Sequence, residues 1–354
     1  MVQVIIKNKP HTLIQQINVE NKVVENIRFF LKESGYLEIG VPTLTPATGS
    51  CEVVDSMFFL DYFGSLAFPR QTGQLYLEEM VVNGLPAVYC EGQSLRKEWK
   101  IDDRHLTEFK LIEIERLDMS LNELCDFQEE LVKYVAKRLS ADDIGGRNVT
   151  RLDRVINSEH PRITYREAIN ILNSKGFSMK FGDDLDKAAE ATLIRHIGNL
   201  PVHITHFPES LKFFNMKLHR EDPIVVDCVD YILPYSGETF GGSLREPDVK
   251  ILRDRLYNGT MYEHLMNRAV EFSKHRKPGS DILIDTRPQG EIGNEYKIVI
   301  QKSFEKYISL FENNPIERAG FGLGVARLIQ FFMGLDSIKD AVVFPMDRGN
   351  FGGV

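Results

Sequence analysis

Gly320, Gly322 and Gly324 alternate with larger residues. A mostly apolar stretch follows directly and carries Arg327 near its start. The helical spacing of apolar residues over 328–333 predicts a helix with one buried stripe. Glycines leave room for a ligand to approach the backbone. A nucleotide beside this segment would lie close to the guanidinium of Arg327, which makes an ATP site the first expectation.

A second polar cluster occupies residues 96–109 and contains Arg96, Glu98, Arg104, His105 and Phe109. Activation of a carboxylate by ATP needs neutralisation of charge at the α-phosphate, where an oxygen attacks and pyrophosphate leaves. Arginine suits this task because its planar fork holds two oxygens at once. A solvated, charged hairpin is the alternative, but the ordered mixture of acid, cations and ring favours a site for a metal-bound triphosphate.

The composition is that of a globular protein, with 43% hydrophobic and 27% charged residues among 354. A formal net charge of −8 argues against a surface built mainly to bind nucleic acid. No apolar run is long enough to cross a bilayer, and the first residues do not resemble a signal peptide. We therefore expect a cytoplasmic protein that does not enter the membrane.

Four cysteines, Cys51, Cys90, Cys125 and Cys228, are far apart in the sequence and form no C-x-x-C pair. This spacing makes a zinc site or a disulfide framework improbable. We expect reduced thiols.

Several local patterns predict individual elements. A helix is expected over residues 18–34, with Gly35 at its C-terminal end. A strand over 36–44 should lie at a sheet edge or bend, because it meets a proline. Capping boxes at Ser120 and Thr164 predict two further helices. An amphipathic helix is expected within 288–315.

Apolar strand-like runs follow at 87–91, 109–115, 201–207, 213–218 and 225–233, without crossover helices between each pair. This order predicts an α+β protein with a mainly antiparallel sheet flanked by helices. The charged, glycine-containing stretch at 141–161 is expected to be a loop.

Three segments together resemble the catalytic domain of class II aminoacyl-tRNA synthetases, closest to the asparaginyl and aspartyl branch. Residues 35–46 resemble motif 1, which forms the dimer interface in that family. Residues 88–116 resemble motif 2, and residues 318–333 resemble motif 3. The resemblance implies a single class II synthetase-like catalytic domain over residues 1–354 and a homodimer. The helix before motif 1 begins near residue 20, so we expect no N-terminal, OB-fold anticodon-binding domain.

The resemblance also implies roles for the residues of motif 2. Arg96 would hold the α-phosphate and Glu98 the adenine amino group. Arg104 and His105 would bind the γ-phosphate, and Phe109 would stack against adenine.

In motif 3, the resemblance places Arg327 over the other face of the base, a cation–π contact worth about 1 to 2 kcal/mol. Gly322 and Gly324 would line the ATP site beneath it. Arg96 and Arg327 are the implied catalytic residues.

Two acids near the middle of the chain match the family's magnesium ligands. Asp230 and Glu238 would hold Mg²⁺ that bridges the phosphates, which fits the preference of this ion for oxygen ligands. Glu238 is the stronger candidate, since Asp230 could equally cap a turn. Arg245 would face the side chain of the substrate, because a guanidinium recognises a carboxylate or an amide oxygen.

The expected amino-acid pocket resembles the asparaginyl version of the family. Gln74 would touch the substrate amino group, and Glu78 is a further substrate-binding candidate. Leu77 stands where aspartyl enzymes usually carry a lysine, which removes one partner for a substrate carboxylate. Thr48 replaces a family glutamate that holds the substrate ammonium, and Glu52 is the candidate substitute.

His203 and His206 suggest a metal site at first sight. An odd separation within a strand turns the two side chains to opposite faces, which argues against it. His105 is the one histidine expected to be functional.

The chain is similar to the archaeal asparagine synthetase related to asparaginyl-tRNA synthetase. We therefore expect an AMP-forming ligase that makes an aspartyl- or asparaginyl-type adenylate and transfers it to ammonia. Transfer to another small-molecule or carrier acceptor in a biosynthetic pathway is the alternative, and a non-catalytic, amino-acid-sensing paralogue is a third. Charging of tRNA loses its main support if the anticodon-binding domain is missing, so a truncated tRNA synthetase is a minor fourth.

Overall fold

The computed structural model describes residues 12–46, 54–63, 65–274 and 289–350. The helices are α1 (Leu13–Glu33), α2 (Gln74–Val82), α3 (Leu121–Ala136), α4 (Ala141–Ile144), α5 (Gly146–Ile156), α6 (Tyr165–Ser174), α7 (Lys187–His196), α8 (Val249–Tyr257), α9 (Thr260–Lys274), α10 (Gln289–Ser309) and α11 (Val325–Met333). The strands are β1 (Leu37–Glu38), β2 (Leu44–Thr45), β3 (Leu60–Tyr62), β4 (Ser65–Pro69), β5 (Ala87–Leu95), β6 (Glu108–Leu117), β7 (Arg162–Thr164), β8 (Val202–Thr205), β9 (Cys228–Leu233), β10 (Gly237–Leu244) and β11 (Arg318–Gly324).

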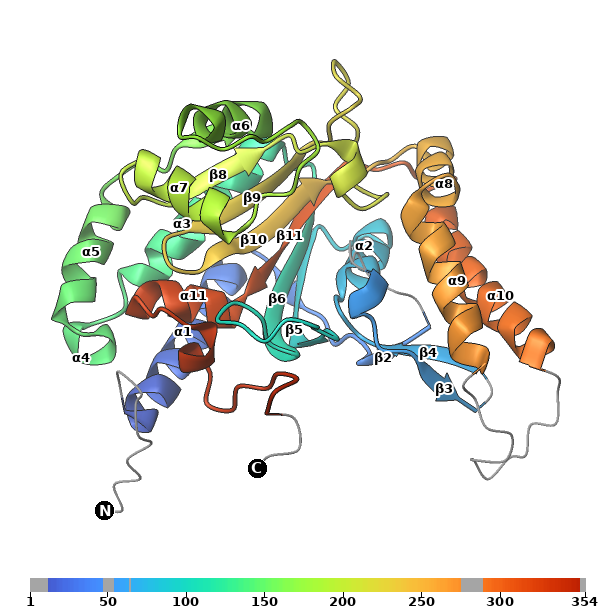
Figure 1. Ribbon diagram of the computed structural model, residues 1–354, viewed down its shortest axis with the longest axis horizontal. Helices are drawn as coiled ribbons and strands as arrows, with labels where there is room; N and C mark the ends of the chain where they lie inside the picture. Colours follow the sequence, from blue (N-terminus) through green and yellow to red (C-terminus); the bar gives the residue numbers. More distant parts are fainter. Residues whose placement is uncertain (1–11, 47–53, 64, 275–288, 351–354) are drawn as a thin grey trace.

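Eight strands form one sheet in the order β1-β5-β6-β11-β10-β9-β8-β7 (Figure 1). The two outermost pairs, β1 with β5 and β7 with β8, are parallel, and the inner pairs are antiparallel. A separate three-stranded sheet has the order β2-β4-β3. The predicted α+β class with a mainly antiparallel sheet is confirmed.

One face of the large sheet packs against α3 and α11, and α1 and α5 pack against these two helices (Figure 1). Its core combines helix residues such as Ile27, Leu131 and Leu328 with strand residues such as Ile114 and Phe321. Because side chains alternate along a strand, the residues next to these in the sequence lie on the opposite face. That opposite face is where the candidate site lies.

A second core lies beside the sheet, where α8, α9 and α10 pack together and against β4 (Figure 1). The helix predicted within 288–315 is confirmed as α10. Ile300, Phe304, Ile308 and Phe311 are buried there as the pattern predicts, whereas Ile298 is 47% exposed.

Helix ends follow the predicted caps. The first helix begins at Leu13, earlier than expected, because the side chain of Thr12 accepts a hydrogen bond from the backbone N–H of Gln15 at 3.1 Å. Gly35 follows its end with φ +82°, a left-handed conformation that glycine adopts without strain. The capping boxes at Ser120 and Thr164 are both present.

Residues 36–44 form β1 at the edge of the large sheet and, after Pro42, enter β2 at the edge of the small sheet, so the predicted edge position and bend are confirmed. Two other predictions of local structure were wrong. The stretch 141–161 holds α4 and α5 instead of a loop, because Gly145, with φ +84°, forms the corner between two short helices. Residues 213–218 form only isolated bridges, from Met216 to Arg245 and from Leu218 to Val226.

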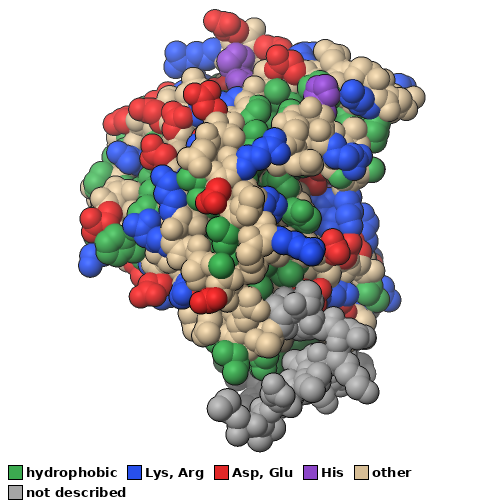
Figure 2. Space-filling view, turned by 90° about the vertical axis from the view of Figure 1, so that its left-hand side faces the viewer, with side chains coloured by type: hydrophobic (Ala, Val, Ile, Leu, Met, Phe, Trp, Pro, Cys, Tyr) green, Lys and Arg blue, Asp and Glu red, His purple; other side chains and the backbone are tan. Residues whose placement is uncertain are grey.

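Acidic and basic side chains are interspersed over the side of the molecule shown in Figure 2. None of the helices within the described ranges combines the length and the apolar character that a membrane span requires. Cys90, Cys125 and Cys228 are buried and form no disulfide within the described ranges, and Cys51 lies outside those ranges.

Candidate active site

A pocket lies on the face of the sheet opposite the α1 and α3 core, over β6, β10 and β11. Strand alternation turns Phe321 and Leu323 into the helix-covered core and leaves Gly322 and Gly324 in the pocket. Glycine at these positions keeps the floor of the pocket free of side chains. The pocket brings together Gln74, Arg96, Glu98, Arg104, His105, Phe109, Asp230, Glu238, Arg245, Gly322, Gly324 and Arg327.

Two of the predicted substrate-binding residues do not belong to this lining. Glu52 lies outside the described residues. Glu78 is fully buried behind the pocket wall, where its carboxylate accepts hydrogen bonds from Arg318 at 2.6 Å and from Tyr307 at 2.7 Å. Its link to the pocket is Gln74, whose side-chain amide donates to Glu78 at 2.8 Å.

The hairpin of β5 and β6 supplies one side of the nucleotide end. The guanidinium of Arg96 lies 5.2 Å from the centroid of the Phe109 ring. Its Nε is buried and has no hydrogen-bond partner among the described residues. A buried donor without a partner costs free energy, so this group is suited to an anionic ligand.

Arg327, in the first turn of α11, supplies the opposite side. Its Nη1 donates a hydrogen bond to the backbone carbonyl of Glu238. Burial lowers the pKa of Arg327 below its ordinary value, and the nearby Glu238 opposes that change. A buried guanidinium remains charged at neutral pH, so Arg327 offers a strong cation in a region of low dielectric.

Both predicted γ-phosphate ligands are already held by acids. The Nη2 of Arg104 donates to Glu190 of α7 at 2.5 Å, and the His105 ring lies 2.8 Å from Asp102. Burial raises the pKa of Glu190, and the charges of Arg104 and Arg327 oppose this. These acids orient the two side chains toward the pocket, and they would compete with a phosphate for the same N–H groups.

Asp230 and Glu238 line the same pocket from the neighbouring strands β9 and β10. No hydrogen bond to the carboxylate of Glu238 is seen among the described residues, so its oxygens can bind a metal ion without losing a partner. Asp230, in contrast, accepts hydrogen bonds from Lys212 at 2.9 and 3.1 Å. The residues therefore fit Mg²⁺ best through Glu238, because this ion is commonly held by one or two carboxylates and the phosphates of the substrate.

The amino-acid end of the pocket is formed by Arg245, which is almost fully buried. Glu115 lies behind it and accepts a hydrogen bond from Nη2 at 3.0 Å and longer ones from Nε. Burial raises the pKa of Glu115 to about 7, although the charge of Arg245 lowers it. Gly320 makes room for this pair, since a Cβ there would lie 2.1 Å from the Glu115 carboxylate.

Sequence reasoning missed three residues that form the site, Glu113, Glu115 and Arg318. Glu113 lines the pocket and fixes the start of α2, where it accepts hydrogen bonds from the Thr72 hydroxyl and from the backbone N–H of Gly73 at 2.7 Å. The available signal was two glutamates at alternate positions within the run Leu111–Glu115, whose other residues are apolar. Buried acids of that kind are paired or functional.

The chain belongs to a family of amino-acid-activating enzymes, the class II tRNA synthetases. The family model described as tRNA synthetases class II (D, K and N) matches residues 4–280 and 283–348. Within that family, the chain is similar to asparagine–tRNA ligases. It is 30% identical to the enzyme of Pelotomaculum thermopropionicum over 334 residues, which cover 93% of this chain and 68% of that protein. It is 32% identical to the enzyme of Pyrococcus furiosus over 342 residues, covering 93% and 67%.

The fold agrees with this assignment. The asparaginyl-tRNA synthetase of Pyrococcus horikoshii, solved in complex with asparaginyl-adenylate, superposes with a TM-score of 0.78 at 31% identity. The match covers 95% of this chain and 69% of that one. The resemblance drawn from the three motifs is confirmed.

Proposed function

We propose that this protein is an AMP-forming ligase that activates asparagine, by attack of its carboxylate on the α-phosphate of ATP. The observation that carries the proposal is the convergence of Arg96, Phe109 and Arg327 with Gln74 and Arg245 in one pocket. The first three suit an adenine nucleotide, and the last two suit a polar amino acid. A solved relative holds asparaginyl-adenylate.

The preference for asparagine over aspartate follows from the charges around Arg245. Ionised Glu115 neutralises Arg245, and Glu78 neutralises Arg318 at 2.6 Å, so the buried cluster carries no net charge while Glu115 is ionised. A substrate carboxylate would add an uncompensated negative charge beside Glu115. A neutral amide would accept a hydrogen bond from Arg245 without that cost.

The side chains predicted to bind ATP keep their roles in this proposal. Arg96 neutralises charge that develops at the α-phosphate, and Arg327 covers the base beside Phe109. Arg104 and His105 approach the γ-phosphate, and Glu98 accepts from the adenine amino group.

Magnesium bound at Glu238 would supply charge neutralisation between the phosphates. Lys212 would then continue to hold Asp230, so that only one carboxylate of the pair is committed to the ion. This arrangement is supported by Glu238, the one carboxylate of the pair that is not held by Lys212.

Pyrophosphate exchange measured with each of the twenty amino acids tests the proposal. Exchange with asparagine alone supports it. Exchange with aspartate alone would overturn the asparagine assignment and favour the aspartate–ammonia ligase expected from the sequence. An absence of exchange in a folded protein would favour a sensing paralogue.

The acceptor is identified by a second step. The enzyme is incubated with ATP, the preferred amino acid and either ammonia, candidate small-molecule acceptors or tRNA, and products are analysed by mass. An asparagine-specific enzyme cannot make asparagine from ammonia, so exchange with asparagine predicts transfer to one of the other acceptors.

We also propose a homodimer formed through the region of motif 1. Several large apolar side chains are exposed there, including Phe29 at 52% and Leu37 at 53%. Apolar side chains gathered on a surface mark an interface. Sedimentation should give a dimer that Leu37→Glu converts to monomer; a wild-type monomer at micromolar concentration would contradict this proposal.

A further inference from the structure

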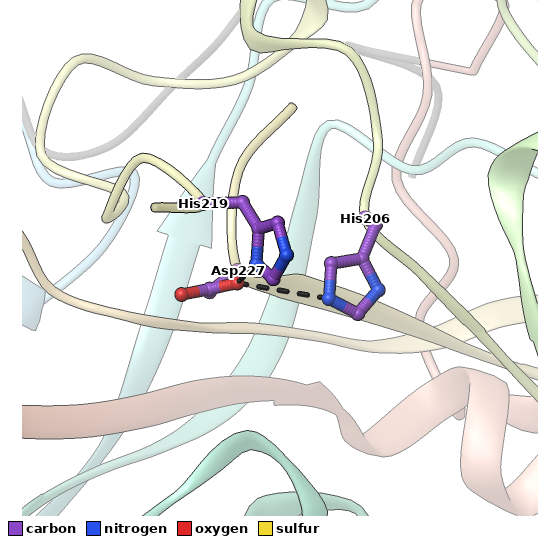
Figure 3. A group of neighbouring side chains, drawn as sticks. All are labelled: His206, His219 and Asp227. Carbon is purple, nitrogen blue, oxygen red and sulfur yellow. Dashed lines mark hydrogen bonds and ion pairs between the residues drawn. The ribbon is translucent and has the colours of Figure 1, made fainter. Parts of the chain in front are cut away.

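A group of two histidines and one aspartate lies outside the pocket, between the end of β8 and the start of β9 (Figure 3). The Nδ1 of His219 lies 2.7 Å from Oδ1 of Asp227, and the Nε2 of His206 lies 3.6 Å from the same oxygen. The two imidazole rings meet edge to face, with centroids 4.9 Å apart. One candidate ligand atom of each residue lies within 4.8 Å of the others.

Of the two histidines that the sequence analysis argued against as a metal-binding pair, only His206 belongs to this group. His203 is fully buried and stacks on Tyr231 at 3.9 Å between ring centroids, so it cannot contribute to a surface site. His206 follows the end of β8 and meets His219, thirteen positions further along the chain. Nothing in the local sequence indicates that contact.

The backbone holds all three residues in place. The N–H of His206 donates to Cys228 O at 3.1 Å, that of His219 to Val225 O at 3.0 Å, and that of Asp227 to Lys217 O at 2.8 Å. His206 also has φ +58°, which is uncommon for a residue other than glycine. Strained backbone of this kind persists where surrounding contacts determine it, often at functional positions.

A neighbouring hydroxyl contacts the second ring nitrogen of His206. The hydroxyl of Thr205 lies 2.8 Å from Nδ1 of His206 and also donates to Ile163 O at 3.5 Å. In the tautomer in which Nδ1–H donates to Thr205, Nε2 offers its lone pair to an ion bound between His206 and Asp227. Metal-binding histidines are oriented in this way by a hydrogen bond from their second nitrogen.

We propose that His206, His219 and Asp227 bind one divalent transition-metal ion of the zinc class. Two imidazoles and a carboxylate are typical zinc ligands and leave a further position for water. Ligand atoms around tetrahedral zinc lie roughly 3.3 to 3.5 Å apart, given metal–ligand distances of about 2.0 to 2.2 Å. The ion replaces the proton between His219 and Asp227, so only a small opening of that contact is needed.

The surrounding charges permit a cation. Lys217 and Arg220 line the same hollow. The ammonium of Lys217 is neutralised by Glu317 at 2.6 and 2.8 Å, and Arg220 extends into solvent, with a side chain 83% exposed. The ion thus has one carboxylate and two neutral rings as its immediate neighbours.

The site also lies at a significant place in the chain. His206 and His219 bracket the segment that carries Lys212 and Met216 into the pocket, where Lys212 holds Asp230. An ion bound at both ends of this segment would close it into a loop and fix the wall of the pocket. Only this consequence rests on the proposed function; metal binding itself does not.

The test is a titration of the whole, chelator-treated protein with Co²⁺ and Zn²⁺, without substrates. We expect one ion per chain, visible Co²⁺ absorption of low-symmetry, four-coordinate character, and its displacement by Zn²⁺. His219→Ala and His206→Ala should each weaken binding by roughly 10- to 100-fold or more, at least as much as loss of an outer-shell partner does. His264→Ala removes an exposed histidine that also pairs with an aspartate, Asp55 at 3.1 Å, and should bind like the wild type.

His219→Gln guards against a folding defect, because it keeps a polar side chain that can still donate to Asp227 while it removes the imidazole. Weak binding by this variant, with a wild-type circular dichroism spectrum, would support the site. Equal affinity in the wild type and His219→Gln, or no Co²⁺ absorption in the folded wild type, would overturn it. Pyrophosphate exchange is measured separately, so failure of the metal site and failure of the proposed activity are distinguished.

Discussion

Glu115 holds the guanidinium of Arg245 from behind the pocket wall, with Nη2 and the carboxylate 3.0 Å apart. Both side chains are buried, and the same cluster contains the ion pair of Glu78 with Arg318. Arg245 therefore reaches the pocket as a hydrogen-bond donor whose charge is already compensated. Under the proposed function, the specificity of the pocket thus depends on a residue that does not line it.

Glu115→Gln should shift the substrate preference from asparagine toward aspartate. The amide keeps the size of the side chain but removes its charge, so Arg245 becomes free to pair with a substrate carboxylate. We expect the ratio of pyrophosphate exchange with asparagine to that with aspartate to fall by about 10- to 100-fold, the range for a hydrogen bond to a charged group. An unchanged ratio in a folded variant would show that Glu115 does not set the specificity.

The same ratio should depend on pH. The pKa of Glu115 is raised by burial from 4.5 to about 7, so this carboxyl gains a proton as the pH falls from 8 to 6. The side chain of free aspartate, with a pKa near 3.9, stays ionised over that range. Discrimination against aspartate should therefore weaken as the pH falls. Glu115→Gln is the control, because its ratio should be flat between pH 8 and 6.

The raised pKa has a consequence for stability. A carboxyl whose folded pKa exceeds its unfolded value contributes stability below the unfolded pKa, and that contribution is lost as the pH rises through the folded pKa. Glu115 should thus lower the free energy of unfolding as the pH rises from about 5 to 8. Urea unfolding of the wild type and of Glu115→Gln checks this, since only the wild type should show this part of the pH dependence.

The sequence predicts the nucleotide end of the pocket better than the amino-acid end. Arg96 and Phe109 lie at the ends of one hairpin, so their local spacing brings them together. Arg327 is recognised from its own strand–helix motif, and the pairing of β11 with β6 brings it to the same pocket. Arg318 and Glu78 are 240 positions apart, and their contact depends on how α2 and β11 pack. Local patterns carry no information on such pairs, as the contact between His206 and His219 also shows.

The same limit applies to the fold. Capping boxes fixed the starts of α3 and α6 because the signal and its effect lie within four residues. The glycine pair after Ser140 was misleading, since glycine is compatible with a loop and with a tight corner between helices. Packing of Leu152 and Val155 into the core decided in favour of helices.

Arg327→Ala should abolish pyrophosphate exchange and leave the fold intact. The side chain lines the pocket and is half-buried, and its removal takes away a cation placed for the nucleotide. Loss of one such electrostatic group costs roughly 10²- to 10³-fold in rate. Arg166→Ala, which breaks a half-exposed pair with Asp222, is the matched control and should keep full activity. Wild-type exchange in Arg327→Ala would refute the assignment of the ATP site.

Gly320→Ala should destabilise the protein and weaken discrimination between asparagine and aspartate. An added Cβ would lie 2.1 Å from the Glu115 carboxylate and 2.2 Å from the backbone carbonyl of Ile114, so either β6 or Glu115 must move. Such overpacking costs about 1 to 3 kcal/mol in the free energy of unfolding.

Gly290→Ala is the control, because a Cβ there meets no described atom within 4 Å and lies in the first turn of α10. Replacement of a helical glycine by alanine at an open position should leave the free energy unchanged or raise it by up to about 1 kcal/mol. Urea unfolding of both variants measures the difference. Equal stability would mean that the backbone of β11 does not confine Glu115. The proposed specificity of Arg245 would then need another explanation.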